Sequence, residues 1–248
     1  MMVFRWRYIP NLKEVNNKEL FASLLVVARP DYIRFAEIAT LSFFFYHPKS
    51  KVRIYCDSIT IKETRMRFKR EISKGQVKVE LVKREELSWQ EHKVEIILSL
   101  ESKNHFFMDC DLRFNSKLPD LQAPLFFVRE YNLCENIDMK NILNKLDRIK
   151  GHKEIFMWNS SFVYWDSYTS ILLKTGLSFS DFEKFLKYAL SNITESKRNE
   201  IWRLREQLYL SVLAGLSGIP LNSLKSEDKR LDGSFLESVY FGSTGLSF

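Results

Sequence analysis

Short apolar segments alternate with segments of helical periodicity over residues 21–111, and this alternation constrains the fold more than any other feature of the chain. Runs rich in β-branched and aromatic residues, bounded by polar residues, predict buried strands. They are FASLLVVA (21–28), KVRIYCD (51–57), QVKVELVK (76–83) and HFFMDCD (105–111). Helices are expected between them at 31–46, with Asp31 as a cap, at 61–72, and at 88–101, with Ser88 as a cap. This order predicts a parallel, doubly wound α/β sheet.

The second half of the chain follows a different pattern. Strands are expected over 125–131 and 155–166, with a polar helix near 137–149 between them. Helical segments follow at 167–175, 179–191 and 196–216, then a short strand near 219–224 and an irregular tail. With 248 residues and 45% hydrophobic composition, the chain can bury one core. We therefore expect one α/β domain over residues 1–248, with a mixed, mostly parallel central sheet flanked by helices.

The formal net charge is +7, but the basic residues do not form one tail. They are spread through 62–74, 145–153 and 197–205, a distribution typical of solvated helix faces. Attraction toward phosphates or toward an anionic membrane surface is the other interpretation of the charge. The sequence contains no zinc finger, ribonucleoprotein motif or basic–aromatic strand, so we expect no nucleic-acid partner.

The cysteines, Cys56, Cys110 and Cys134, are odd in number and widely spaced. They form neither a disulfide framework nor a zinc pattern, which favours a reducing compartment. The N-terminal sequence lacks the apolar core of a signal peptide, and no segment approaches the ~20 apolar residues needed to span a bilayer. We predict a cytoplasmic protein, with at most peripheral association at the inner membrane face.

Polar residues follow several of the expected strands. Arg29 follows the first strand, Asp57 ends the second, and Asp109 and Asp111 end the strand that begins at 105. In doubly wound sheets, ligands bind beyond the carboxyl ends of the strands. These residues are therefore the first candidates for a binding site.

The segment HFFMDCD combines an apolar strand with two carboxylates two residues apart. Burial of an unpaired carboxylate is costly, so Asp109 and Asp111 should lie at an open strand end with a partner. Carboxylate oxygens suit Mn²⁺ or Mg²⁺, which keep coordination positions for substrate phosphates. The alternative is that these are ordinary strand-end acids that cap the chain or pair with lysine.

An apolar strand followed by D-x-D, after a series of strands and helices, resembles the metal site of GT-A glycosyltransferases. The resemblance implies a GT-A-like domain of the Rossmann-like type and a hexosyltransferase activity. A nucleotide-diphosphate sugar would be the donor, and a glycan, lipid-linked or protein hydroxyl the acceptor. Asp111 would ligate the metal directly, and Asp109 would contact the donor ribose, or the metal through water. Residues 1–20 would be a lead-in, 21–115 the nucleotide-binding half and 116–248 the acceptor-side half.

Two downstream segments resemble acceptor-side elements of the same family. In IFMWNSSFVYWD, Asn159 and Ser160 would face the sugar and acceptor, although a polar kink in a core strand is the simpler interpretation. In the segment LREQ, Glu206 and Gln207 match a helix that packs beside the acceptor. Glu206 would be the base if the enzyme inverts. The alternative interpretation of Glu206 is a solvated helix acid paired with Arg203 or Arg205.

The resemblance also implies weaker donor contacts at Arg29, Asp57 and Lys93, each of which could equally be an exposed surface residue. Many metal-dependent relatives supply a further ligand, commonly His, near the C-terminus. Here VYFGSTG occupies that region, and Ser243 and Thr244 would be poor substitutes for imidazole. Without that histidine, either water fills the ligand position or the dependence on the metal is weakened or absent.

Other functions remain open at this stage. A haloacid-dehalogenase-type phosphatase also uses D-x-D, but normally on its first strand. A nucleotidyltransferase would want a glycine-rich loop after the first strand, where this chain has VVARPDYIR. A GT-A-like binding protein that has lost catalysis is the non-enzyme alternative.

Overall fold

The computed structural model describes residues 19–100, 104–118, 125–133, 135, 137–146, 155–165, 168–218, 222–223 and 236–238. Most of the expected lead-in, and the tail segment with Ser243 and Thr244, lie outside these residues. In the described part of the chain, no helix has the length and apolarity that a bilayer span requires.

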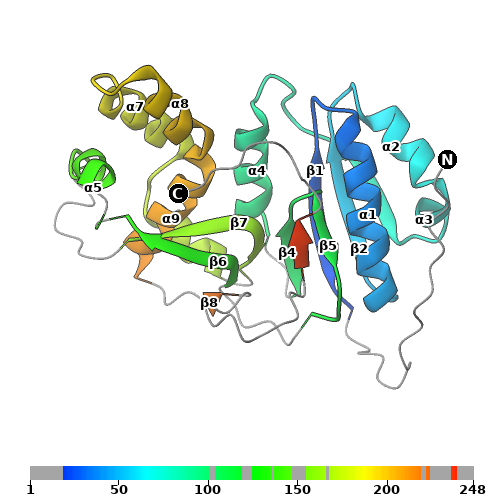
Figure 1. Ribbon diagram of the computed structural model, residues 1–248. Helices are drawn as coiled ribbons and strands as arrows, with labels where there is room; N and C mark the ends of the chain where they lie inside the picture. Colours follow the sequence, from blue (N-terminus) through cyan, green and yellow to red (C-terminus); the bar gives the residue numbers. More distant parts are fainter. Residues whose placement is uncertain are drawn as a thin grey trace.

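A central sheet runs through the described part of the chain in the order β3-β2-β1-β4-β7-β6-β8 (Figure 1). Its strands are β1 (Phe21–Val26), β2 (Lys51–Cys56), β3 (Val77–Leu81), β4 (His105–Met108), β6 (Leu125–Asn132), β7 (Phe156–Tyr164) and β8 (Asn222–Ser223). The β1/β2, β1/β4, β2/β3 and β6/β8 pairs are parallel, whereas β7 is antiparallel to both β4 and β6. The expected mixed, mostly parallel sheet is thus confirmed.

The helices cover both faces of this sheet (Figure 1). They are α1 (Asp31–Tyr46), α2 (Ile61–Arg67), α3 (Lys69–Ser73), α4 (Trp89–Leu98), α5 (Ile137–Leu143), α6 (Thr169–Leu173), α7 (Phe179–Ala189), α8 (Glu195–Arg203) and α9 (Arg205–Ser217). Side chains alternate across a strand, so β4 contributes to two cores. Phe106 and Met108 pack with α1, and Phe107 packs with α4 and α9. Strands buried on both faces explain the continuous apolar runs.

The contact between α9 and β7 is especially close. A Cβ atom on Gly215 would lie 3.1 Å from the Cγ1 atom of Ile155, tighter than an ordinary carbon contact. The Ser211 hydroxyl, one turn earlier, accepts the Trp158 N–H at 2.9 Å. These contacts fix the second half of α9 beside the start of β7.

The helix expected over 61–72 is divided in the structure. Phe68, between α2 and α3, has φ −97° and ψ 17°, outside helical geometry. Its side chain is buried with the α1 core, so tertiary packing overrides the local helical pattern there.

The helix expected over 196–216 is divided in the same way. Leu204, with φ −95° and ψ 10°, separates α8 from α9. As a result Arg205 and Glu206 lie in the first turn of a new helix.

Three further expectations need correction. Asp31 does not cap α1: the N-cap residue is Pro30, without a side-chain capping bond, and the Asp31 carboxylate bonds Arg29 instead. The tail is not wholly irregular, because β9 (Leu236–Ser238) pairs antiparallel with β5 (Leu112–Phe114). The strand expected over 105–111 also ends earlier, at Met108, and the D-x-D segment forms the connection from β4 to β5.

Candidate active site

Asp109 lies directly beyond the carboxyl end of β4. Its N–H donates to the Ser161 carbonyl at 2.7 Å, and its carbonyl accepts the Leu112 N–H at 3.3 Å, which closes a turn between β4 and β5. Between the two acids, Cys110 is buried in the α1-side core and anchors this turn. The carboxylates therefore leave the sheet at its carboxyl edge, as the sequence predicts, and the Asp109 side chain is 26% exposed.

Lys93, on α4, is the residue that binds Asp109. Its Nζ atom lies 2.9 Å from Oδ1 and 3.0 Å from Oδ2 of that carboxylate, and 5.4 Å from the centre of the Phe107 ring. The lysine side chain is only 3% exposed. Burial opposes its charge, but the carboxylates of Asp109 and Glu206 outweigh burial and raise the pKa of Lys93 above its ordinary value. The interpretation of Lys93 as an exposed surface lysine is wrong.

Glu206, in the first turn of α9, lies on the other side of the same ammonium. Its Oε1 atom is 4.0 Å from Nζ of Lys93, and its side chain is 2% exposed. The Oε2 atom is buried and has no hydrogen-bond partner among the described residues. Burial raises the pKa of this carboxyl, although the Lys93 charge acts in the opposite direction. The interpretation of Glu206 as a solvated helix acid is therefore also wrong.

Three residues that the sequence analysis named separately thus form one cluster. Lys93 comes from α4, Asp109 from the end of β4 and Glu206 from α9. Asp111 is partly exposed in the same turn, and its charge also helps to raise the pKa of Lys93. The ammonium between these carboxylates fixes their relative placement at this edge of the sheet.

Asp57, at the end of β2, holds the neighbouring loop. One carboxylate oxygen accepts the Ala28 N–H at 2.5 Å, and the other accepts the Thr60 N–H at 2.9 Å and the Thr60 hydroxyl at 2.8 Å. Ala28 has φ 60°, a left-handed conformation that costs energy in a residue with a Cβ. The backbone bond from Ala28 to Asp57 stabilises this conformation. These bonds help to hold the pKa of Asp57 below its ordinary value despite partial burial.

Arg29 lies in the same loop and is half-exposed. It pairs with Asp31 at 2.7 Å and stacks over the Tyr32 ring, 4.6 Å from its centre. Through its bond to Ala28, Asp57 joins the loop after β2 to the loop after β1 that contains Arg29. They share the carboxyl edge with the Lys93 cluster because β1, β2 and β4 are parallel.

Asn159, Ser160 and Gln207 lie where β7 meets α9. The β6/β7 register shifts between Phe126 and Val128, so the Asn159–Ser160 segment lies in an irregular part of the ladder. Such bulges redirect side chains. Asn159 Oδ1 accepts the Ser161 N–H at 2.9 Å, and Ser160 is buried, with no partner for its hydroxyl among the described residues. The Gln207 carbonyl accepts the Ser211 hydroxyl at 2.7 Å.

A cavity of about 430 Å³ lies at the opposite, amino-terminal edge of the sheet. It is lined by the starts of β1, β2 and β4, with Lys51, Arg53, Lys78 and His105 among its residues. Its cations have acidic partners: Lys51 pairs with Glu19, and both Arg53 and Lys78 pair with Glu80. None of the residues expected at the site lines this cavity.

Comparison with known proteins identifies the fold. The chain has the GT-A fold of glycosyltransferases. It superposes on an active-site mutant of LgtC with a TM-score of 0.51 and 8% identity, covering 82% of this chain and 72% of that one. The galactosyltransferase LgtC with donor and acceptor sugar analogues gives 0.49 and 10%, covering 82% and 73%. GlyE of Streptococcus pneumoniae TIGR4 gives 0.49 and 13%, covering 84% and 46%.

No family model matches the sequence, and a search of curated proteins finds no match. At such low identities the structural likeness establishes the fold, and the chemistry has to be argued from the residues of this chain.

Proposed function

We propose that this protein transfers a sugar from a nucleotide-diphosphate sugar to a hydroxyl of a glycan, lipid-linked or protein acceptor. The observation that carries the proposal is the cluster of Lys93, Asp109 and Glu206 at the carboxyl edge of a GT-A sheet. Ligands of open α/β sheets bind at that edge. The Lys93 ammonium, held by Asp109, would offer an N–H donor to an oxygen of the diphosphate.

On the donor side, Lys93 would bind the diphosphate, and Arg29 and Asp57 would contact the nucleotide from the neighbouring strand ends. Lys93 already bonds Asp109, so its ammonium is held in place before the donor binds. Three donors on one ammonium allow it to keep that bond while it contacts a phosphate oxygen. The bonds that Asp57 makes to Ala28 and Thr60 keep the nucleotide-side loop in one conformation.

The D-x-D carboxylates fit a Mn²⁺ or Mg²⁺ ion by the chemistry of their donors. Both offer hard oxygen ligands, and each carboxylate has about four lone-pair sites, so Asp109 can bind Lys93 and a metal together. Among the described residues, no group of three His, Cys, Asp or Glu side chains is placed to hold a metal. Asp109 and Asp111 would therefore hold it with water and donor oxygens. When bound, the metal neutralises charge that develops on the departing diphosphate.

On the acceptor side, the proposed contacts are Asn159, Ser160 and Gln207, whose amide and hydroxyl groups suit sugar hydroxyls. Glu206 is proposed as the base that removes the acceptor proton if the reaction inverts. Its raised pKa brings the carboxyl closer to neutral pH, as general base catalysis requires. The unpartnered Oε2 atom is the acceptor for that proton.

The test is a panel of UDP- and GDP-sugars assayed for hydrolysis and for transfer to simple acceptors, with Mn²⁺, Mg²⁺ or EDTA. We expect turnover with a metal, and its loss in Asp111→Asn. The matched control is Glu63→Gln, which removes one exposed carboxylate on α2. Binding of nucleoside diphosphate without turnover would instead indicate a protein that has kept the fold and lost catalysis. Turnover by Asp109→Asn and Asp111→Asn at the wild-type rate would contradict the proposal.

A further inference from the structure

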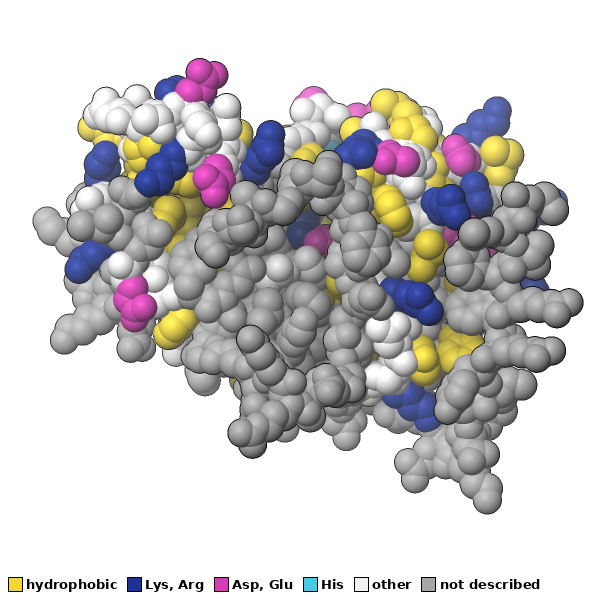
Figure 2. Space-filling model, viewed as in Figure 1, with side chains coloured by type: hydrophobic (Ala, Val, Ile, Leu, Met, Phe, Trp, Pro, Cys, Tyr) yellow, Lys and Arg dark blue, Asp and Glu magenta, His cyan; other side chains and the backbone are white. Residues whose placement is uncertain are grey.

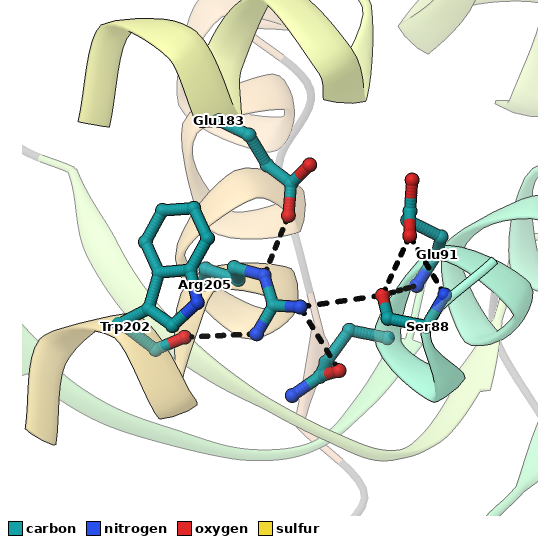
Figure 3. Close-up of polar contacts among 6 residues, drawn as sticks. Ser88, Glu91, Glu183, Trp202 and Arg205 are labelled. Carbon is teal, nitrogen blue, oxygen red and sulfur yellow. Dashed lines mark hydrogen bonds and ion pairs between the residues drawn. The ribbon is translucent and has the colours of Figure 1, made fainter. Parts of the chain in front are cut away.

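Arg205 is a buried arginine next to Glu206 that the site described above does not use. It is 6% exposed and begins α9. Figure 3 shows its guanidinium between Glu183 of α7 and the Ser88–Glu91 pair at the start of α4. One side chain of α9 thus joins α7 to the start of α4, which lies 115 residues earlier in the sequence.

The guanidinium contacts are numerous and directional. Nε donates to Glu183 at 2.6 Å, and one terminal nitrogen donates to the Trp202 carbonyl at 3.1 Å. The other terminal nitrogen donates to the Ser88 hydroxyl at 3.2 Å and to Oε1 of Gln90 at 3.0 Å. Its carbon atom also lies 4.7 Å from the centre of the Trp202 ring. A guanidinium has donors in a rigid fork, which a lysine ammonium cannot reproduce.

These contacts reach the first turn of the helix that carries Lys93. Ser88 caps α4 in a capping box: its hydroxyl accepts the Glu91 N–H, and Glu91 accepts the Ser88 N–H at 2.8 Å. Lys93 follows about one turn later on the same helix. Arg205 and Glu206 are adjacent on α9, so the fork ties the starts of the two helices that face each other across the cluster.

We propose that Arg205 is a positioning residue that holds the start of α4 against the start of α9 and so sets the placement of Lys93 between Asp109 and Glu206. The inference rests on the proposed function for its catalytic consequence. Its structural consequence, a fixed and buried Lys93 ammonium, can be measured without any substrate.

The test compares Arg205→Lys with Gln90→Met, which keeps Arg205 and its Glu183 pair but removes the bond to the α4 side chain. Arg203→Lys is the matched control, because Arg203 is exposed at the end of α8. In protein labelled with ¹⁵N-lysine, the buried Lys93 ammonium should give a slowly exchanging signal, assigned by its loss in Lys93→Arg. We expect this signal to broaden or vanish in Arg205→Lys and Gln90→Met, and to persist in Arg203→Lys.

With an active donor, kcat/KM should fall by up to about 100-fold in Arg205→Lys, the order of loss that a misplacement of ~1 Å can produce. Most of that fall should appear in KM for the donor, because Lys93 is the proposed diphosphate contact. If Arg205 had a purely structural role, the substitutions would lower the melting temperature. They would leave the Lys93 signal, and the KM of the folded fraction, unchanged. That result in both variants would overturn the proposal. The Lys93 signal could be present in wild type and lost in Arg205→Lys, while no donor is turned over. That result would contradict only the proposed transferase function.

Discussion

Lys93 binds both carboxylate oxygens of Asp109, with its Nζ atom at 2.9 and 3.0 Å, and the ammonium is almost fully buried. A buried ion pair is weak evidence of net stability, but removal of one partner leaves a buried charge without compensation. The pair therefore links the folding of the α4–β4 unit to the chemistry of the candidate site.

Asp109→Asn should lower the free energy of unfolding by about 1–3 kcal/mol, because an amide oxygen still accepts one bond from Lys93 but no longer neutralises it. Urea unfolding of the variant and of wild type measures this loss. Glu63→Gln should stay within about 0.5 kcal/mol of wild type, as expected for an exposed charge. Lys93→Met combined with Asp109→Asn should recover part of the loss. A double variant as unstable as the sum of both single variants would show that the two side chains do not interact.

Glu206→Gln should change the pH dependence of stability. Burial raises the pKa of Glu206 above its ordinary 4.5, so the folded protein binds this proton more tightly than the unfolded chain. Stability from this group is complete below pH 4.5 and is lost as the pH rises through the folded-state pKa. The stability of Glu206→Gln relative to wild type should therefore rise as the pH rises above 4.5, and should stay constant below that pH. Urea midpoints measured from pH 4 to pH 8 test this, and a constant difference across the range would contradict it.

Local signals explain which parts of the fold were predictable. The bounds of α1 match the expected 31–46, because Pro30 and the His47–Pro48 pair punctuate an apolar helical pattern. The start of α4 was equally readable, since Ser88 and Glu91 have the spacing of a capping box. Both signals lie within a few residues of the feature that they determine.

The site was predictable only in part, because several of its features depend on residues that are distant in the sequence. Asp109 could be named because a carboxylate pair ends an apolar strand. A lysine on a charged helix is usually exposed, so the burial of Lys93 depends on β4 and α9, which the local sequence does not reveal. Arg205 could be considered only as a partner of Glu206, whereas packing brings it to Glu183 and Gln90 instead. The breaks at Phe68 and Leu204 were likewise set by tertiary packing.

His47 should make the protein sensitive to mild acid. Its Nε2 atom accepts the Leu118 N–H at 3.0 Å, which requires a neutral ring, and burial lowers the pKa of His47 to about 4. Because the folded-state pKa is depressed, the stabilisation is present above pH 6.5 and is lost as the pH falls toward 4, by an amount on the order of 2–3 kcal/mol. His47→Gln can keep an acceptor near that N–H without titrating. Its urea midpoint should fall less steeply than that of wild type between pH 6.5 and pH 4, and equal slopes would contradict the assignment.

Replacement of all three cysteines by serine should leave substantial activity. Cys56 and Cys110 are free and buried, at 0% and 5% exposure, and Cys134 lies outside the described residues. Burial raises the pKa of Cys110, and the neighbouring Asp111 and Asp109 charges raise it further, so its thiolate is disfavoured although it lies between the two candidate metal ligands. A serine hydroxyl buried without a partner costs about 1–3 kcal/mol at each site, so the variant should be less stable than wild type. Turnover per folded molecule, measured at a temperature where circular dichroism shows the variant intact, should stay within about tenfold of wild type. A folded variant without turnover would show that a cysteine takes part in the reaction.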